Sequence, residues 1–527
     1  MRKSIVMLIA ITALLFTACG GPAQTGGGVP QGYRKADVLE ANIHPLIGIG
    51  AEVDPHFFSQ NVTRFNSMKA EDWAIVENRV REMKIHRFRV MLLPEWLEPL
   101  NDNADSSVIN WDALTPESEE MQSLYALLDL AEEEGIDVNL TLWGCNRMVK
   151  LLDQNMQNQV GNVHFLAQDN DSPNWTVGAK DAEEFAENFS MFVQLLVLQK
   201  GYTCIKDITP INEPSWTYLI DSGSSYSGNF NAYAEMCRIL HNRFKADGIR
   251  DKVLFNLSDD AENMNWLTNS ANHLATIDLG NSESETLADM FNSHTYQFGY
   301  TTKNTAIANW QRQCTSAVSA TGKPHMIGEY GSNENVGSTR QRDIDSYERG
   351  VLIVRQALNF FNQGSSGVSH WTLYDQYYNK SGLYNEMMQL GFWRSVKSEY
   401  ASETYYNELT EDYQIRPAYY AFSLLTRHTR PGAEIYPVDV GLDFVAATAF
   451  KNPDGKWVAA IANGGTEASK LTLFGSGLVG SFKHYVYENG SLPTGDAGIQ
   501  SDVSIAAENG YLSAEVSANT VVLLVQE

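Results

Sequence analysis

Short apolar, β-branched stretches alternate with longer amphipathic stretches of helical period from about residue 45 to residue 430. This alternation is typical of a parallel sheet whose strands are joined by helices. We predict eight strands, the number that closes a barrel, at 46–53, 85–93, 136–143, 205–211, 252–258, 290–296, 325–329 and 367–373. The pattern therefore predicts an α/β fold in which residues 39–430 form a (β/α)8 TIM barrel.

The predicted connecting helices carry their own start signals and apolar faces. Asp181 followed by Glu184 has the spacing of a capping box. Apolar residues then recur every three or four positions on a single helix face, at Phe185, Phe189, Phe192 and Leu196. A helix of this kind packs its stripe against the strands.

The pattern changes after Arg430-Pro431-Gly432, where short alternating strands and turn residues replace the helical stretches. Asn452-Pro453-Asp454-Gly455 lies between two apolar runs and indicates a hairpin. The chain has 527 residues, well beyond the roughly 250 of a typical barrel, so a second domain is expected. Residues 431–527 are predicted to form a small all-β domain, a β-sandwich, packed on the barrel.

The N-terminal end has the composition of an export signal. Arg2 and Lys3 precede an apolar run from Ile5 to Phe16 that is too short to span a bilayer. Phe16-Thr17-Ala18-Cys19 resembles a bacterial lipoprotein box, which implies that residues 1–19 are a signal peptide and that Cys19 is lipidated. An ordinary signal peptide cut nearby is the alternative. The Gly-rich segment 20–38 would then be a flexible tether. The protein would be an outer-membrane lipoprotein of a bacterial cell envelope that faces either the periplasm or the surface. Its N-terminal lipid would be its one attachment to the membrane.

Charge and cysteine content narrow the function classes further. The formal net charge of −26 repels nucleic acid and anionic headgroups and favours a neutral partner. Cys145, Cys204, Cys237 and Cys314 are far apart and lack metal-ligand spacing. We interpret them as buried thiols.

Two glutamates follow predicted strands at a distance of 329 − 213 = 116 residues, in Ile211-Asn212-Glu213-Pro214 and Ile327-Gly328-Glu329-Tyr330-Gly331. The C-terminal ends of barrel strands converge on one cup. Two carboxyl groups in that cup are what a retaining glycosidase needs, one as acid/base and one as nucleophile about 5–5.5 Å away. Glu213 is the candidate acid/base and Glu329 the candidate nucleophile. Asn212 is a candidate donor to the sugar 2-hydroxyl, with a turn asparagine as the alternative.

The Asn-Glu-Pro and Gly-Glu-Tyr-Gly strings, in this order and context, resemble the signatures of clan A glycoside hydrolases, with echoes of families 5, 30 and 39. The resemblance spans residues 45–430 and implies a retaining β-glycosidase. It implies that Tyr296, after the sixth strand, contacts the nucleophile, with His294 lining the site. It also implies that Arg89 on the second strand lies beside a carboxylate, although Arg87 shares its face. Core packing or an ordinary ion pair is the alternative for each.

Two tryptophans complete the predicted substrate site. The same resemblance implies that Trp371, which ends the eighth predicted strand, lies under the sugar in the reacting subsite, and that Trp143 lines another side of the site. For both tryptophans, plain core packing is the alternative. We expect an oligosaccharide or polysaccharide as partner and a monomeric protein. No metal or other cofactor is expected, and Asp259-Asp260 is interpreted as a solvated turn.

The sequence thus favours hydrolysis of a neutral β-linked glycan, β-glucan first and then xylan or mannan. Two other interpretations stay open. One is a surface glycan-binding lipoprotein on a catalytically retired barrel. The other is a transglycosylase, which would use the same residues and differ in how water is excluded.

Overall fold

The computed structural model describes residues 29–55, 70–142, 179, 181–217, 228–280, 282–334, 341–379, 385–395 and 412–527. Its centre is a closed barrel of parallel strands in the order β10-β11-β2-β3-β4-β5-β6-β9, which confirms the predicted fold class. The strands are β2 (Gly48–Val53), β3 (Arg87–Leu92), β4 (Asp137–Leu142), β5 (Ile205–Thr209), β6 (Leu254–Ala261), β9 (Met290–Thr295), β10 (His325–Tyr330) and β11 (Ser365–His370). Each lies within a few residues of a predicted strand.

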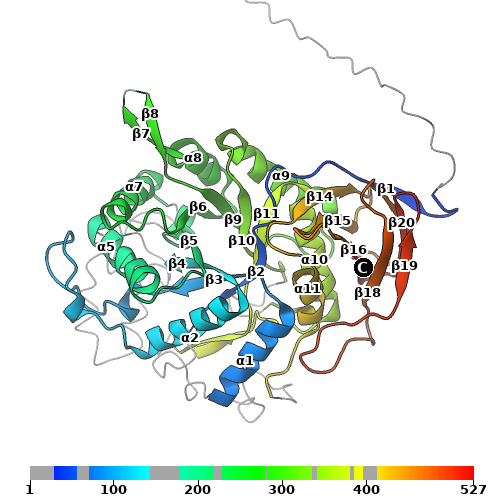
Figure 1. Cartoon of the computed structure of the whole chain (residues 1–527), viewed down its shortest axis with the longest axis horizontal. Helices are drawn as coiled ribbons and strands as arrows, with labels where there is room; N and C mark the ends of the chain where they lie inside the picture. Colours follow the sequence, from blue (N-terminus) through cyan, green and yellow to red (C-terminus); the bar gives the residue numbers. More distant parts are fainter. Residues whose placement is uncertain are drawn as a thin grey trace, which may run out of the picture.

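Helices surround the barrel (Figure 1) and begin where the sequence supplies caps. The Asp181 carboxylate accepts hydrogen bonds from the backbone N–H groups of residues 183 and 184, and all four predicted stripe residues of this segment are buried. Ser118 and Ser346 cap two further helices in the same way. The helices are α1 (Ala70–Met83), α2 (Glu119–Glu134), α5 (Ala182–Val193), α6 (Pro214–Thr217), α7 (Phe230–Ala246), α8 (Met264–Leu274), α9 (Asn304–Val318), α10 (Tyr347–Asn362) and α11 (Pro417–His428).

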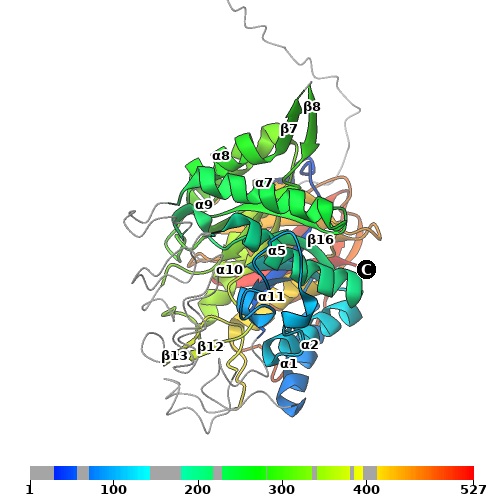
Figure 2. The same ribbon diagram turned by 90° about the vertical axis from the view of Figure 1, so that its left-hand side faces the viewer.

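Two hairpins are inserted between barrel elements. One consists of β7 (Thr276–Gly280) and β8 (Glu283–Thr286), follows α8 and projects from the molecule (Figure 2). Because it precedes the start of β9, it lies at the N-terminal face of the barrel. The other consists of β12 (Gln376–Asn379) and β13 (Asn385–Met388), and follows the last barrel strand.

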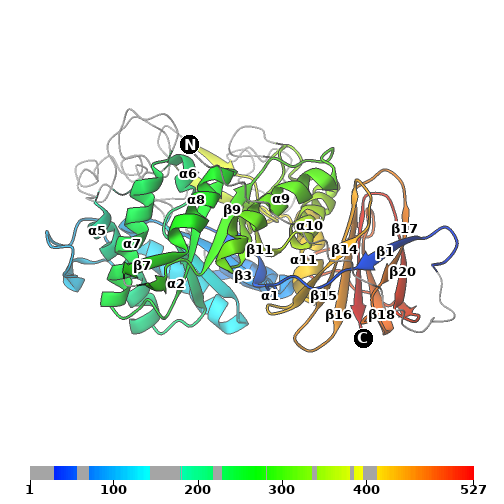
Figure 3. The same ribbon diagram turned by 90° about the horizontal axis from the view of Figure 1, so that it is seen from above.

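The second domain lies beside the barrel (Figure 3) and forms a mostly antiparallel sheet in the order β19-β18-β21-β16-β15-β14-β1-β17-β20. The sheet folds over so that β20 also contacts β16, β19 and β21 around an apolar core. Its strands are β1 (Arg34–Val38), β14 (Glu434–Asp439), β15 (Val445–Lys451), β16 (Trp457–Asn463), β17 (Ser469–Phe474), β18 (Gly480–Tyr487), β19 (Ser504–Ala507), β20 (Tyr511–Val516) and β21 (Thr520–Gln526).

The first strand of this sheet corrects one prediction. Residues 34–38 fall within the predicted tether 20–38, yet they form β1, which pairs with β14 and with β17. Backbone hydrogen bonds on both sides and the buried side chain of Ala36 fix this short segment. The chain therefore enters the β-domain before it enters the barrel.

The predicted buried thiols and the question of membrane-spanning helices can be checked in the described residues. Cys204, Cys237 and Cys314 are buried free thiols. Cys19 and Cys145 lie outside the described residues. No helix in the described part of the chain combines the length and apolar character needed to cross a membrane.

The two domains share one hydrophobic core across α10 and α11. Helix α10 packs on β14, β15, β16 and β21, and apolar residues of both domains belong to one continuous cluster. The rings of Tyr347 and Tyr487 stack across the boundary at 4.5 Å, and each hydroxyl donates to the other residue's carbonyl oxygen. Asp496 adds an ion pair with Arg79 at 2.9 Å.

The tight boundary predicts an unusual response to a helix-favouring substitution. Alanine normally stabilises a helix interior by about 0.5–1 kcal/mol relative to glycine. A Cβ on Gly350 would lie 2.5 Å from the Tyr487 hydroxyl oxygen and 2.9 Å from the Ala421 Cβ. We expect Gly350→Ala to destabilise the protein by about 1–3 kcal/mol through overpacking, measured as a lower midpoint of thermal unfolding. Ser316→Ala on the exposed side of α9 is the control, and equal midpoints for the two variants would contradict the packing argument.

Candidate active site

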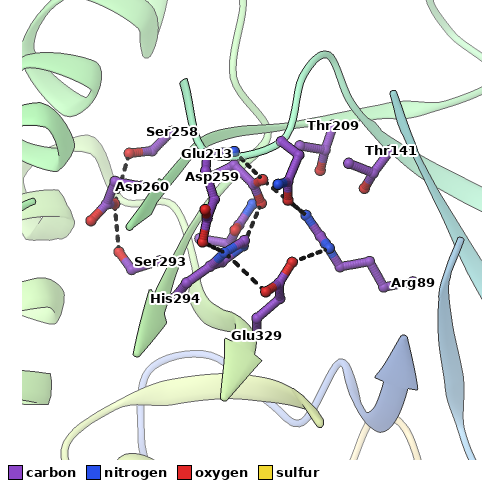
Figure 4. A network of polar contacts seen from close by, with 12 residues as sticks. Arg89, Thr141, Thr209, Glu213, Ser258, Asp259, Asp260, Ser293, His294 and Glu329 are labelled. Atoms are coloured by element: carbon purple, nitrogen blue, oxygen red, sulfur yellow. Dashed lines mark hydrogen bonds and ion pairs between the residues drawn. The ribbon is translucent and has the colours of Figure 1, made fainter. Parts of the chain in front are cut away.

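The two predicted catalytic glutamates come together at the C-terminal end of the barrel. Glu213 follows β5, immediately before α6, and Glu329 lies near the end of β10. Oxygen atoms of the two carboxyl groups and a nitrogen of His294 all lie within 4.8 Å of one another. Figure 4 shows these side chains converging from separate strands. Closure of the barrel brings together positions that are 116 residues apart.

Arg89 binds the candidate nucleophile from the second barrel strand. Its Nη1 donates to Glu329 Oε1 at 2.6 Å, and its Nη2 donates to Asn212 Oδ1 at 2.8 Å. Because the Asn212 oxygen accepts from Arg89, the amide NH₂ group points away from the guanidinium. Arg87 lies two residues earlier and pairs with the buried Asp207 instead. The structure thus separates the two arginines of this strand, and Arg89 is the one at the site.

His294 lies between the two glutamates. Its Nδ1 is 2.9 Å from Glu213 Oε1 and 3.4 Å from Glu329 Oε2, and its Nε2 is 3.0 Å from Asp259 Oδ1. Burial alone would lower the pKa of this imidazole, but Asp259 and Glu329 raise it to about 10. His294 is therefore an imidazolium at neutral pH, and both ring nitrogens donate.

Asp259 is the residue that sequence analysis missed. Its position beside Asp260 after a strand predicts a solvated turn, but Asp259 and Asp260 are both buried. Strand β6 continues through them with a bulge between Ser258 and Asp260, and Ser258 and Asp259 both have positive φ. Bulges of this kind redirect side chains next to active sites. The aspartates directly follow the predicted strand 252–258, and this position at a strand end was the available signal.

The Asp259 carboxylate links three parts of the site. It accepts from Arg89 Nη2 at 2.9 Å, from the His294 ring and from the backbone N–H of Glu213 at 3.2 Å. Burial alone would raise its pKa, but Arg89 and His294 lower it to about 2. Glu213 itself has φ of 47°, an uncommon conformation for a non-glycine residue. The bond to Asp259 helps to hold that conformation.

Tyr296 donates its hydroxyl to Glu329 Oε2 at 2.8 Å. Burial raises the pKa of the Glu329 carboxyl above its ordinary value, His294 and Arg89 oppose this rise, and Glu213 adds to it.

The predicted tryptophans have different outcomes. Trp371 directly follows β11, is buried, and donates its backbone N–H to the carbonyl oxygen of Tyr330, the neighbour of Glu329. This places Trp371 beside the nucleophile strand. Trp143 lies outside the described residues.

The cluster of Glu213, His294 and Glu329 also has the spacing of a potential metal site. Sequence spacing gave no indication of one, because the three residues come from three different strand ends.

Comparisons with known proteins bear on the fold. No family model matches the sequence, and no curated protein matches it. The structure resembles the catalytic domain of xylanase C of glycoside hydrolase family 30 from Talaromyces cellulolyticus, with a TM-score of 0.60 at 14% identity over 93% of this chain and 99% of that one. It also resembles an endo-β-1,6-glucanase, with 0.57 at 15% over 93% of each chain. A family 39 β-xylosidase from Caulobacter crescentus gives 0.55 at 14% over 94% of this chain and all of that one.

The chain has a glycoside hydrolase fold. The three similar structures belong to the clan that the two glutamate strings indicated, and each is covered almost completely, including the β-domain. At these identities the likeness shows the fold, and the activity has to be argued from the site.

The position of Asp259 generates a prediction. Asp259→Asn keeps the side-chain shape but removes the anion that both buried cations contact. We expect kcat/KM to fall roughly 100-fold, since leaving a buried charge without its partner costs about 3 kcal/mol. The NMR titration of His294 should move to lower pH in the variant. Asp289→Asn, which alters the Arg250 ion pair outside this cluster, is the control, and an unchanged His294 titration in Asp259→Asn would contradict the assignment.

Proposed function

We propose that the protein is a retaining β-glycosidase that hydrolyses a neutral β-linked glycan, with Glu213 as acid/base and Glu329 as nucleophile. The observation that supports this most is the approach of the two carboxyl groups, of which one oxygen atom each lies within 4.8 Å of the other and both of which contact the His294 ring. A short separation of about 5–5.5 Å between the carboxyl groups is typical of retaining enzymes.

Contacts around Glu329 support its role as the nucleophile. Arg89 donates to one of its carboxylate oxygens and Tyr296 to the other, and the His294 ring lies 3.4 Å away. Donors of this kind stabilise the ionised carboxylate that must attack the sugar. The first chemical step requires one ionised and one protonated glutamate, and the proposal assigns the proton to Glu213.

In the first step Glu329 attacks the anomeric carbon while Glu213 gives its proton to the departing oxygen. Glu329 loses its charge on forming the glycosyl ester, and Glu213 gains one on losing the proton, so the total charge of the two glutamates does not change. His294 lies within 3.4 Å of an oxygen of both glutamates. Its positive charge can stabilise the carboxylate on either side without moving far.

In the second step Glu213 removes a proton from water, which attacks the ester and releases the sugar with retained configuration. Tyr296 and Arg89 bind the Glu329 carboxylate as the leaving group of this step. Asn212, oriented by Arg89, would donate to the sugar 2-hydroxyl, where hydrogen bonds strengthen in the transition state. Trp371 and Trp143 would contact the apolar faces of the sugar.

The substrate proposal rests on charge and on likeness. A net charge of −26 disfavours anionic polymers. The similar structures bear the names of xylan-, β-1,6-glucan- and β-xyloside-cleaving enzymes. We propose β-glucan as the first candidate, followed by xylan and mannan. A screen of these polysaccharides with chain-length analysis of the products tests the proposal, and products longer than the substrate would indicate a transglycosylase. A chain that binds glycan but cleaves none would be a retired catalyst.

Azide rescue tests the division of roles. Glu213→Ala should still form the glycosyl ester from aryl glycosides with good leaving groups, because these need little protonation. Azide should restore its turnover and give a β-glycosyl azide from a β-glycoside. Glu329→Gly with azide should instead give the α-azide. Product stereochemistry by NMR is the measurement; swapped products would reverse the two roles, and full activity in either variant would remove that residue from the mechanism.

We further propose that the protein is an outer-membrane lipoprotein of a bacterial envelope, on the basis of Phe16-Thr17-Ala18-Cys19. Cys19→Ala should then prevent acylation and release the protein from membrane fractions, because the lipid would be the anchor. Immunoblots of fractionated cells provide the measurement. A variant that stays in the membrane fraction like the wild type would contradict the proposal.

A further inference from the structure

We infer that Glu213, His294 and Glu329 form a binding site for Zn²⁺, which competes with the substrate and inhibits the enzyme reversibly. The three side chains offer two carboxylate oxygens and one imidazole nitrogen within 4.8 Å of one another. Zn²⁺ binds this mixture of ligands, commonly with three protein groups and one position left open. The binding itself is independent of the proposed function, whereas its effect on activity rests on it.

The donor distances suit a small ion. Zn–N and Zn–O bonds of about 2.0–2.2 Å in a tetrahedral arrangement place neighbouring donor atoms about 3.3–3.5 Å apart. His294 Nδ1 lies 2.9 Å from the Glu213 oxygen and 3.4 Å from the Glu329 oxygen. Shifts of a few tenths of an ångström would therefore bring these two pairs to ligand spacing, and the third pair, the oxygens of Glu213 and Glu329, lies within 4.8 Å.

The surroundings of His294 match those of a metal-binding histidine. Such a histidine almost always donates its second ring N–H to a carboxylate or carbonyl, which fixes the ring and increases the basicity of the metal-binding nitrogen. His294 Nε2 lies 3.0 Å from Asp259 Oδ1, and Asp259 is held in turn by Arg89. The Nδ1 atom is thereby directed at the two glutamates.

The charges around the site favour a cation. Glu213, Glu329 and Asp259 place three carboxylates around the His294 ring, and Arg89 is the cation in direct contact with two of them. Metal ligands must be deprotonated to bind, so binding of Zn²⁺ releases protons.

The position of the ion explains why substrate and metal exclude each other. The Glu213 side chain is 16% exposed and that of His294 is 1% exposed, so the ion reaches the site from the side of Glu213. There it would lie between the acid/base and the nucleophile, where the anomeric carbon must be placed. Mg²⁺ and Ca²⁺ favour all-oxygen ligand sets and should not compete.

Calorimetric titration of the purified full-length chain with Zn²⁺ tests the binding. We expect one ion per chain, with affinity reduced at least 10-fold in Glu213→Gln and in His294→Gln, and reduced about 10-fold in Asp259→Asn. His241→Asn is the control, because this histidine pairs with Glu285 and not with the cluster. Circular dichroism establishes that each variant is folded. Absence of binding to the wild type, or unchanged affinity in both Glu213→Gln and His294→Gln, would overturn the inference.

Kinetics with an aryl β-glycoside test the competition. Zn²⁺ should raise the apparent KM without lowering kcat, EDTA should reverse the effect, and Mg²⁺ and Ca²⁺ should have none. A fall in kcat at unchanged KM would place the inhibitory ion elsewhere and overturn the competition. Zn²⁺ bound by the three residues of a chain that cleaves no glycan would support the site and refute the proposed function. Hydrolysis by a chain that binds no Zn²⁺ would support the proposed function and refute the metal site.

Discussion

The hydrogen bonds between β11 and β2 join the last barrel strand to the first, and the arrangement of the site depends on this closure. Gly367 pairs with Gly48, and Gly50 pairs with Arg87 on the next strand. A Cβ on Gly50 would lie 2.3 Å from the Arg87 carbonyl oxygen, and one on Gly367 would lie 2.9 Å from the Gly48 carbonyl oxygen. Small residues at this seam let the strands approach and complete the ring. Only in a closed ring can Arg89 on the second strand reach Glu329 on the seventh.

Once the barrel is closed, its C-terminal end contains more charge than an apolar interior tolerates without compensation. The structure compensates these charges by pairing each charged side chain with side chains of opposite charge, and not by exposing them to solvent. Asp259 contacts both cations, Arg89 contacts two carboxylates, and His294 contacts three. Removing one partner from such a network leaves a buried charge uncompensated, which costs more than the pair contributed. The same pairing fixes the orientation of the candidate catalytic groups, so stability and preorganisation have a common origin.

Much of this arrangement could be predicted from the sequence because strand ends are visible in a hydrophobic pattern. The eight strands, the β-domain and the meeting of Glu213 with Glu329 follow from periodicity and from the geometry of a closed barrel. The place of Asp259 in the site could not be predicted because a bulge is a local departure from the two-residue period of a strand. Two adjacent aspartates after a strand also have the composition of a turn. Strand β1 could not be predicted because its five residues, next to a glycine-rich segment, are too few to show a clear alternation of apolar and polar positions. Their pairing partners also lie about 400 residues away in the sequence.

The charges of Asp259 and His294, which lie beside the two glutamates, make the stability of the site depend on pH. The pKa of Asp259 is lowered to about 2, below its unfolded value of about 3.9, so its stabilising contribution is complete above that value and is lost toward pH 2. The pKa of His294 is raised to about 10, so its contribution is complete below its unfolded value of about 6.5 and is lost as the pH rises through 10. Between these limits both residues keep their charges. Within this range Asp259 and His294 therefore present the same charges to the two glutamates, and the ion pairs that hold Arg89, Asp259 and His294 in place stay intact.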